Sequence, residues 1–222
     1  MPFLTRYVKM GIKDIIKEIM RYIGSRGIVA GGAVRDLVLG RKPKDIDVFI
    51  FYEKDFRRIV KRGIFDKKPQ KTERPFEANY PSTFEVYNTT LHGYPVQLIW
   101  NDHVEETFKK NIRATDIINC FDFTINMMYI GGKRNVFSPR VVLSTNIFIT
   151  DEAQESINER RIIFNPGHHS GISSSAGTAK FLMKRMVYLA CKLDFVIAPN
   201  TIQQVIEKYS GFCSALEAVE WR

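Results

Sequence analysis

The chain has 222 residues, of which 45% are hydrophobic and 26% are charged, a composition typical of a globular protein and not of a disordered one. Its apolar stretches, such as 48–52, are too short to cross a bilayer, and the first residues lack the apolar core of a secretion signal. The formal net charge of +9 favours a nucleic acid or nucleotide partner. Three widely spaced cysteines form no disulfide or zinc pattern. We therefore expect a cytoplasmic protein with no membrane partner.

The first hundred residues alternate between helical and strand patterns. The elements expected from apolar spacing are a helix at 12–23, a strand at 27–30, a helical face over 34–38, a turn at 41–44, a strand at 45–52 and a helix at 55–61. The basic stretch 66–81 contains three prolines and no periodic pattern, which predicts a long loop. Strands at 84–87 and 95–100 are expected to form a hairpin across His92-Gly93.

The second half is expected to be more helical. Helices are expected at 104–110, 123–128, 181–193 and 201–209, with one or two short strands within 135–150. A polar, glycine-rich segment at 165–177 separates the last two helices from the rest, and it contains His168-His169. Adjacent residues seldom point the same way, so we expect this pair to contact nucleic acid or to lie in a loop, not to bind metal.

Gly31-Gly32 lies between an expected strand and an expected helix. Glycine lets the backbone approach a ligand closely, and the N-terminus of a helix suits a phosphate. A glycine pair at such a turn is also used simply for packing.

Asp45 and Asp47 are two positions apart on the expected central strand, so their side chains point to the same face. Two neighbouring carboxylates repel each other, and a cation would remove that cost. Mg²⁺ prefers carboxylate oxygens together with substrate phosphates. Two solvated aspartates at a strand edge are the alternative.

Together these residues resemble a known family. The segment from Gly31 to Arg41, followed by Asp45-Ile46-Asp47, is similar to the polymerase-β nucleotidyltransferase superfamily. More narrowly, it resembles the head domain of CCA-adding enzymes and bacterial poly(A) polymerases. Residues 122–128 resemble the family's Arg-Arg-Asp-Phe-Thr-Ile-Asn-Ala-Met segment, and residues 185–195 resemble its neck helix.

The resemblance implies an α+β fold, with a nucleotidyltransferase head at 1–150 (a mixed sheet with flanking helices) and a helical neck-like region at 151–222. It implies that two aspartates hold Mg²⁺, with a two-metal site expected, and that a second group of residues holds the nucleoside triphosphate. The implied metal ligands and catalytic residues are Asp45 and Asp47. The implied nucleotide-binding residues are Gly31, Gly32, Arg35, Asp36, Asp122 and Asn126. For the last two, capping of the following helix is an alternative role.

The chain also departs from the family pattern. If 94–98 is the strand that carries the third acid in other members, Gln97 replaces that acid, and Glu85 substitutes only if its side chain faces the two aspartates. The arginine pair of the second block becomes Cys120-Phe121, a loss for which the basic stretch 67–74 or Lys184 and Arg185 could compensate. The base-reading Glu-Asp-x-x-Arg motif aligns with Thr178, Ala179 and Leu182, which cannot pair with a base edge. The chain is also expected to be too short for a tRNA-gripping body and tail.

Three hypotheses follow. The leading one is a nucleotidyltransferase that moves a nucleotide from a triphosphate to an RNA 3′-hydroxyl, a tRNA end being one candidate, with release of pyrophosphate. The second moves the nucleotide to a protein hydroxyl. The third is a catalytically weak relative that binds nucleotide or RNA. The sequence does not indicate the oligomeric state.

Overall fold

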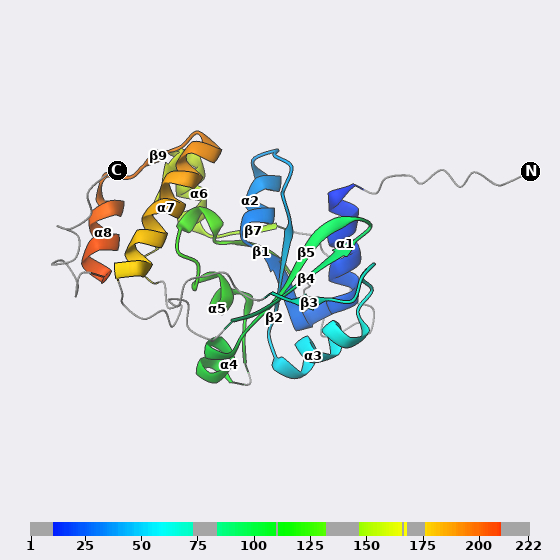
Figure 1. Ribbon diagram of the computed structural model, residues 1–222. Helices are drawn as coiled ribbons and strands as arrows, with labels where there is room; N and C mark the ends of the chain where they lie inside the picture. Colours follow the sequence, from blue (N-terminus) through cyan, green and yellow to red (C-terminus); the bar gives the residue numbers. More distant parts are fainter. Residues whose placement is uncertain are drawn as a thin grey trace, which may run out of the picture.

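The computed structural model of the protein describes residues 11–72, 84–109, 111–131, 147–165, 167 and 176–209. Its centre is a seven-stranded mixed sheet with the strand order β3-β4-β5-β2-β1-β6-β7 (Figure 1). The strands are β1 (Gly27–Ala30), β2 (Ile46–Ile50), β3 (Gln70–Lys71), β4 (Phe84–Leu91), β5 (Tyr94–Asn101), β6 (Met128–Gly131) and β7 (Ile147–Ile149). This α+β architecture is the fold class expected from the sequence.

The helices in the described residues are α1 (Ile12–Ile23), α2 (Gly32–Val38), α3 (Glu53–Arg62), α4 (Asp102–Phe108), α5 (Ala114–Ile118), α6 (Asp151–Asn158), α7 (Ala176–Leu193) and α8 (Pro199–Tyr209). Short 3-10 turns occur at Gly24–Arg26 and Thr124–Asn126, and β8 (Arg161–Ile162) pairs with β9 (Val196–Ile197). No helix within the described ranges is long and apolar enough to span a membrane.

Two apolar clusters cover the two faces of the sheet. On one face of the sheet, apolar residues of α1, α2 and α3 pack against strand side chains such as Val48 and Leu98. On the other face, α4 and α5 pack against Phe49 and Ile99. Because successive side chains of a strand point to opposite faces, Asp47 shares its face with Phe49. The site residues therefore lie on the face that α4 and α5 cover only in part.

Helices α6, α7 and α8 lie together on one side of the molecule, beyond the sheet edge formed by β6 and β7 (Figure 1). Their apolar residues belong to the same core cluster as the head: Ala153, Leu182 and Leu189 are part of one cluster with Phe123 and Val48. Polar contacts cross the same boundary, including the 2.5 Å hydrogen bond between the Thr124 and Ser156 hydroxyls. A division of the chain at residue 150 stays a prediction.

The sequence-based expectation was wrong at 123–128, where a helix was expected. Residues 124–126 form a 3-10 turn and β6 starts at Met128. The edge of β1 pairs with β6 in antiparallel register, Val29 opposite Ile130, and this long-range pairing overrides the local helical pattern. Conversely, β3 lies inside the expected loop.

Several expectations concern residues outside the described ranges. They include most of the loop after β3, most of the strand region at 135–150, and His168-His169. Helices α5 and α6 were not expected from the sequence.

Candidate active site

The glycine turn after β1 brings the backbone against a carboxylate. Gly31 has φ +74°, a left-handed conformation that favours glycine, and its N–H donates to the Met128 carbonyl at 3.2 Å. A Cβ added to Gly31 would lie 3.6 Å from the Phe121 ring and 3.8 Å from Asp47 Oδ2. Gly32 is the first residue of α2, which has no side-chain cap. The turn, the Phe121 ring and Asp47 therefore converge at one point.

Asp45 and Asp47 are both partly exposed, whereas Ile46 and Val48 between and after them are fully buried. The pKa of Asp47 is raised to about 7, first by burial and second by the charge of Asp45. Arg185 and Arg35 act in the opposite direction and lower it. Asp47 therefore carries its negative charge at an energetic cost near neutral pH, which a bound cation would offset.

Gln97 lies directly beside Asp47, because β2 and β5 are parallel with these two residues in register. Glu85 is opposite Trp100 in the β4–β5 ladder, which places it on the other face of the sheet. There its carboxylate accepts hydrogen bonds from Arg57 at 2.5 and 2.8 Å. Glu85 therefore does not replace the third acid. Within the described residues, no group of three or more His, Cys, Asp or Glu side chains is arranged to hold a metal.

Arg35, Asp36 and Asn126 form a buried hydrogen-bonded unit behind the glycine turn. Arg35 Nε and Nη2 donate to Asp36 Oδ1 at 2.8 and 2.6 Å, and Nη1 donates to Asn126 Oδ1 at 2.8 Å. Lys192 on α7 donates to Asp36 Oδ2 at 2.9 Å. A Cβ on Gly32 would lie 3.6 Å from Arg35 Nη2, so the guanidinium borders the turn. This unit connects α2, the 3-10 turn and α7.

Asp122 forms an ion pair with Arg185, a contact that the sequence did not predict. Its buried Oδ2 lies 3.1 Å from Arg185 Nε on α7, and its Oδ1 accepts a hydrogen bond from the Phe123 N–H at 3.1 Å. Asp122 is therefore not the cap of a helix. Arg185 also lowers the pKa of Asp47, so its guanidinium is within electrostatic reach of that carboxylate. The sequence offered Arg185 as one of several basic residues that could replace the missing arginine pair, and the structure shows its contact with Asp122.

Tyr94 is a residue near the site that sequence reasoning missed. Its hydroxyl donates to the Pro43 carbonyl, in the turn that leads into Asp45. Burial and the charges of Asp45 and Asp36 raise its pKa. A tyrosine at the first position of a strand gives no local signal of this contact, which depends on the pairing of β5 with β2.

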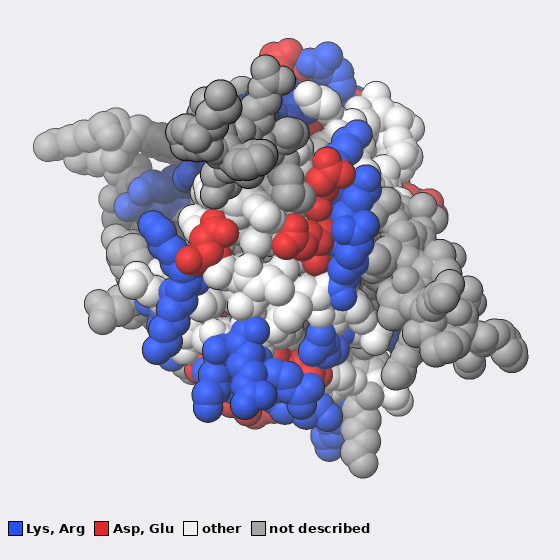
Figure 2. All heavy atoms as spheres, turned by 90° about the vertical axis from the view of Figure 1, so that its right-hand side faces the viewer, with Lys and Arg blue, Asp and Glu red and all other residues white. Residues whose placement is uncertain are grey.

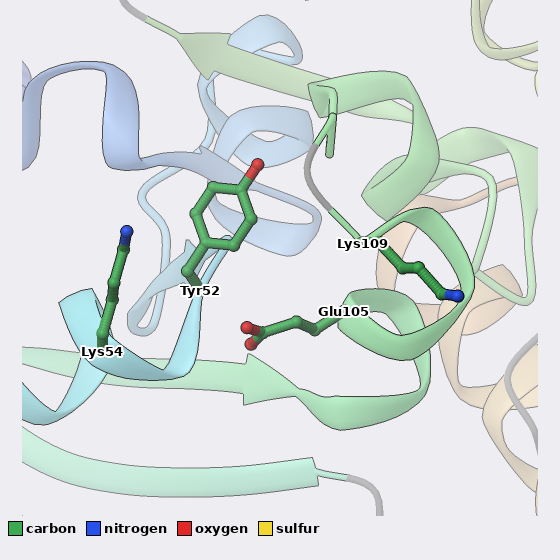
Figure 3. Close-up of a pocket in the computed structure, with 4 residues that line it drawn as sticks. All are labelled: Tyr52, Lys54, Glu105 and Lys109. Atoms are coloured by element: carbon green, nitrogen blue, oxygen red, sulfur yellow. The ribbon is translucent and has the colours of Figure 1, made fainter.

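A shallow pocket of about 590 Å³ lies away from the carboxylate pair, near the carboxyl end of β2. It is lined by Tyr52, Lys54, Glu105 and Lys109, and Lys109 points away from the other three (Figure 3). Glu105 Oε2 accepts hydrogen bonds from the Glu53 N–H and the Trp100 indole, both at 2.7 Å. Its carboxylate thus holds the start of α3, and the pocket is not part of the candidate site.

A protein-family comparison matches residues 4–160 to Gad2, the Gabija anti-defense 2 family. The chain belongs to the Gabija anti-defense 2 family. A comparison with curated protein sequences gives no match.

This family member has the fold of CCA-adding enzymes. A CCA-adding enzyme in complex with CTP has a TM-score of 0.59 and 19% identity, covering 94% of this chain and 44% of that chain. A tRNA nucleotidyltransferase complexed with a primer tRNA and an incoming ATP analog has a TM-score of 0.56 and 16% identity, covering 92% and 52%. The Thermotoga maritima CCA-adding enzyme complexed with tRNA has a TM-score of 0.56 and 16% identity, covering 88% and 40%.

These comparisons confirm the resemblance expected from the sequence, a head-and-neck fold like that of CCA-adding enzymes. The chain spans about half the length of those proteins or less. At the positions aligned with the base-reading motif, Ala179 and Leu182 are 2% and 0% exposed and belong to the core cluster. In this member of the Gabija anti-defense 2 family, these two side chains of α7 pack into the core.

The raised pKa of Asp47 predicts a pH-dependent stability. The pKa of Asp47 is about 7 in the folded protein, above the ordinary 3.8, so the folded state holds this proton more tightly than the unfolded state does. The resulting stabilisation is fully present below pH 3.8 and is lost as the pH rises through 7. In metal-free buffer, Asp47→Asn should therefore stabilise the protein by about 2 kcal/mol near pH 8, a figure reduced for partial exposure. Urea unfolding near pH 4, 6 and 8 measures the gain, which should approach zero at the lowest pH. A gain that does not vary with pH would contradict this assignment.

Proposed function

We propose that the protein is a metal-dependent nucleotidyltransferase that moves a nucleoside monophosphate from a nucleoside triphosphate to an RNA 3′-hydroxyl. The observation that carries the proposal is the Asp45–Asp47 pair at the start of β2, which lies beside a glycine turn and within electrostatic reach of two arginines. In such a reaction the hydroxyl oxygen bonds to the α-phosphorus, the bond from that phosphorus to the β-phosphate oxygen breaks, and pyrophosphate leaves with release of the hydroxyl proton.

The donor set fits magnesium. Asp45 and Asp47 offer neighbouring carboxylates, and burial followed by the charge of Asp45 raises the pKa of Asp47, a cost that a bound cation would offset. Mg²⁺ is commonly held by one or two carboxylates together with substrate phosphates, so two acids suffice for one ion. When bound, the ion would supply charge neutralisation at the reacting phosphate. Gln97 contributes a neutral amide oxygen, and it makes a second ion harder to hold.

Arg185 and Arg35 are proposed to bind the phosphates. Asp122 orients Arg185, while Asp36 and Asn126 orient Arg35, so neither guanidinium needs to reorganise when the triphosphate binds. Preorganised cations of this kind are the main source of catalysis in phosphoryl transfer. Arg185 would take over the charge that the family's arginine pair supplies, since Cys120-Phe121 occupies those positions.

Two acceptors are considered for the transferred nucleotide, an RNA 3′ end and a protein hydroxyl. An RNA 3′ end is supported by the net charge of +9 and by the fold shared with proteins solved with tRNA. A protein hydroxyl is the second candidate, and the family match favours it, since an anti-defense protein acts against a defence system. The buried Ala179 and Leu182 fit both, because neither acceptor requires selection of the incoming base at these positions. The reducing cytoplasm is the proposed location.

The test is incorporation of label. The protein is incubated with Mg²⁺ and each α-labelled nucleoside triphosphate, together with either total RNA or cell protein. Label in RNA supports the leading function, and label in protein supports the second. No incorporation with either acceptor, while nucleotide binding is retained, would leave a catalytically weak relative.

Gln97→Glu tests the position of the missing acid. Because Gln97 lies beside Asp47 in register, glutamate would place a third carboxylate next to the pair. We expect Mg²⁺ affinity to rise about tenfold and metal-free stability above neutral pH to fall, through added like-charge repulsion. Calorimetric Mg²⁺ titration with a non-hydrolysable triphosphate measures the Mg²⁺ affinity. Urea unfolding in EDTA measures the metal-free stability. Glu85→Gln, on the opposite face, is the control for Mg²⁺ affinity and should leave that affinity unchanged. Unchanged Mg²⁺ affinity in Gln97→Glu would contradict the placement.

A further inference from the structure

The solvent side of α3 carries a row of cations. Five basic residues recur every three or four positions: Lys54, Arg57, Arg58, Lys61 and Arg62. This spacing places them on one side of the helix, and all five are exposed. The opposite side is apolar, with Phe56 and Ile59 fully buried against the sheet. Figure 2 shows lysine and arginine side chains gathered at the bottom of that view, where α3 lies. We call these five residues the α3 basic face.

Most of this charge is not neutralised within the protein. Arg57 is paired with Glu53 at 3.2 Å and with Glu85 at 2.5 Å. Arg58 has only a 3.9 Å contact with Asp55. In the part of the chain that the structure describes, no acidic side chain forms an ion pair with the other three. Four cations of the row thus remain largely available to a partner.

The basic surface continues from α3 toward the sheet edge. Glu85 on β4 accepts from Arg57 and also lies 3.4 Å from Lys71 on β3, so the helix and the edge strand are neighbours there. Lys67 and Lys68, which precede β3, are exposed as well. The whole surface lies on the sheet face opposite Asp45 and Asp47.

The chemistry of this surface favours a phosphate backbone over a protein partner. From Lys54 to Arg62 the helix rises about 12 Å, a length that matches roughly three phosphates of one nucleic-acid strand. Protein interfaces are anchored by apolar or aromatic side chains, and the exposed large apolar residues of the described regions lie on other elements than α3. We propose that the α3 basic face docks the phosphate backbone of a nucleic acid. The proposal does not require nucleotidyl transfer, because binding there is separate from the carboxylate pair.

The test compares two charge-matched variants by fluorescence anisotropy, with a labelled 20-nucleotide RNA and a 20-base-pair DNA duplex as probes. One variant is Arg58→Gln/Lys61→Gln/Arg62→Gln. The control is Lys109→Gln/Arg113→Gln/Lys180→Gln, which removes the same charge from exposed positions on other elements. The α3 variant should bind at least about tenfold more weakly at 0.1 M salt, and its slope of log affinity against log salt should fall by about 2 to 3. The control should keep most of its affinity and slope.

Equal losses in the two variants would overturn the proposal, since only overall charge would then matter. No loss in either variant would overturn it as well, as would competition by polyglutamate at the same charge concentration as the nucleic acid. The binding assay is repeated in Asp45→Asn/Asp47→Asn. Binding retained there, with transfer lost, separates this surface from the proposed active site. Absence of transfer in the wild type would refute the proposed function and leave this inference standing.

Discussion

Asp45→Asn/Asp47→Asn is expected to reduce nucleotidyl transfer by at least about 1,000-fold, because it removes the carboxylate charge that would hold the metal and the triphosphate. Each single substitution should reduce transfer by at least about 100-fold. The measurement is the initial rate of incorporation from an α-labelled triphosphate into the acceptor that the wild type uses.

The control for this experiment is Glu85→Gln, which makes the same carboxylate-to-amide change on the other face of the sheet. It should keep transfer within a few-fold of wild type. Unfolding does not account for a loss in Asp47→Asn, since that substitution is expected to stabilise the metal-free protein. Retention of most of the activity in Asp45→Asn/Asp47→Asn would contradict the placement of the site.

Arg185→Ala is expected to have the second-largest effect, about a 100-fold loss in kcat/KM for the nucleoside triphosphate. The substitution removes the cation that lies 3.1 Å from Asp122 and within electrostatic reach of Asp47. It also leaves the buried Asp122 carboxylate without its ion pair, at a cost of about 1 kcal/mol, since Arg185 is 41% exposed. Steady-state kinetics with varied triphosphate concentration and urea unfolding measure the two effects.

Arg185→Lys distinguishes a phosphate-binding role from a structural one. Lysine keeps the charge but loses the planar fork, so it should restore stability more fully than kcat/KM. Lys184→Ala, on the exposed side of the same helix, is the matched control and should leave both quantities unchanged. If Arg185→Ala lowers stability while kcat/KM stays at the wild-type value, Arg185 only joins α7 to the head.

The elements predicted well from the sequence are those whose signal is local. The run of isoleucines that forms α1, the apolar strand that carries Asp47 and the His92-Gly93 turn depend on residues a few positions apart. Gly31 is also a local signal, in this case of a tight turn. Its φ of +74° is a left-handed conformation that favours glycine. The assignment of the carboxylate pair as a metal site stays a prediction, and Asp45 lies just before β2, which begins at Ile46.

What the sequence did not show depends on contacts between distant segments. Residues 128–131 form a strand because the edge of β1 is available to pair with them. Arg185 lies more than sixty positions from its partner Asp122, and Tyr94 contacts the turn before Asp45 through the β2–β5 pairing. From the sequence, Gln97 replaces the third acid only if 94–98 is the corresponding strand. The β2–β5 register places Gln97 beside Asp47, and the β4–β5 register places Glu85 on the other face of the sheet.

The base-reading positions show a further limit of alignment. The sequence indicated that Ala179 and Leu182 lack hydrogen-bonding groups, and the structure adds that both are buried in the core. Their burial means that restoring polar residues there would disrupt α7 packing rather than create nucleotide selectivity.

The most direct test of the central claim uses the position of the label in the triphosphate. The wild-type protein with Mg²⁺ is given the same nucleoside triphosphate labelled on the α-phosphate or on the γ-phosphate, with total RNA and cell protein as acceptors. The predicted result is stable incorporation of α-label only, release of γ-label as pyrophosphate, and loss of both in EDTA and in Asp45→Asn/Asp47→Asn. Transfer of the γ-label to the acceptor, or α-label incorporation that survives EDTA and the double substitution, would contradict nucleotidyl transfer at this carboxylate pair.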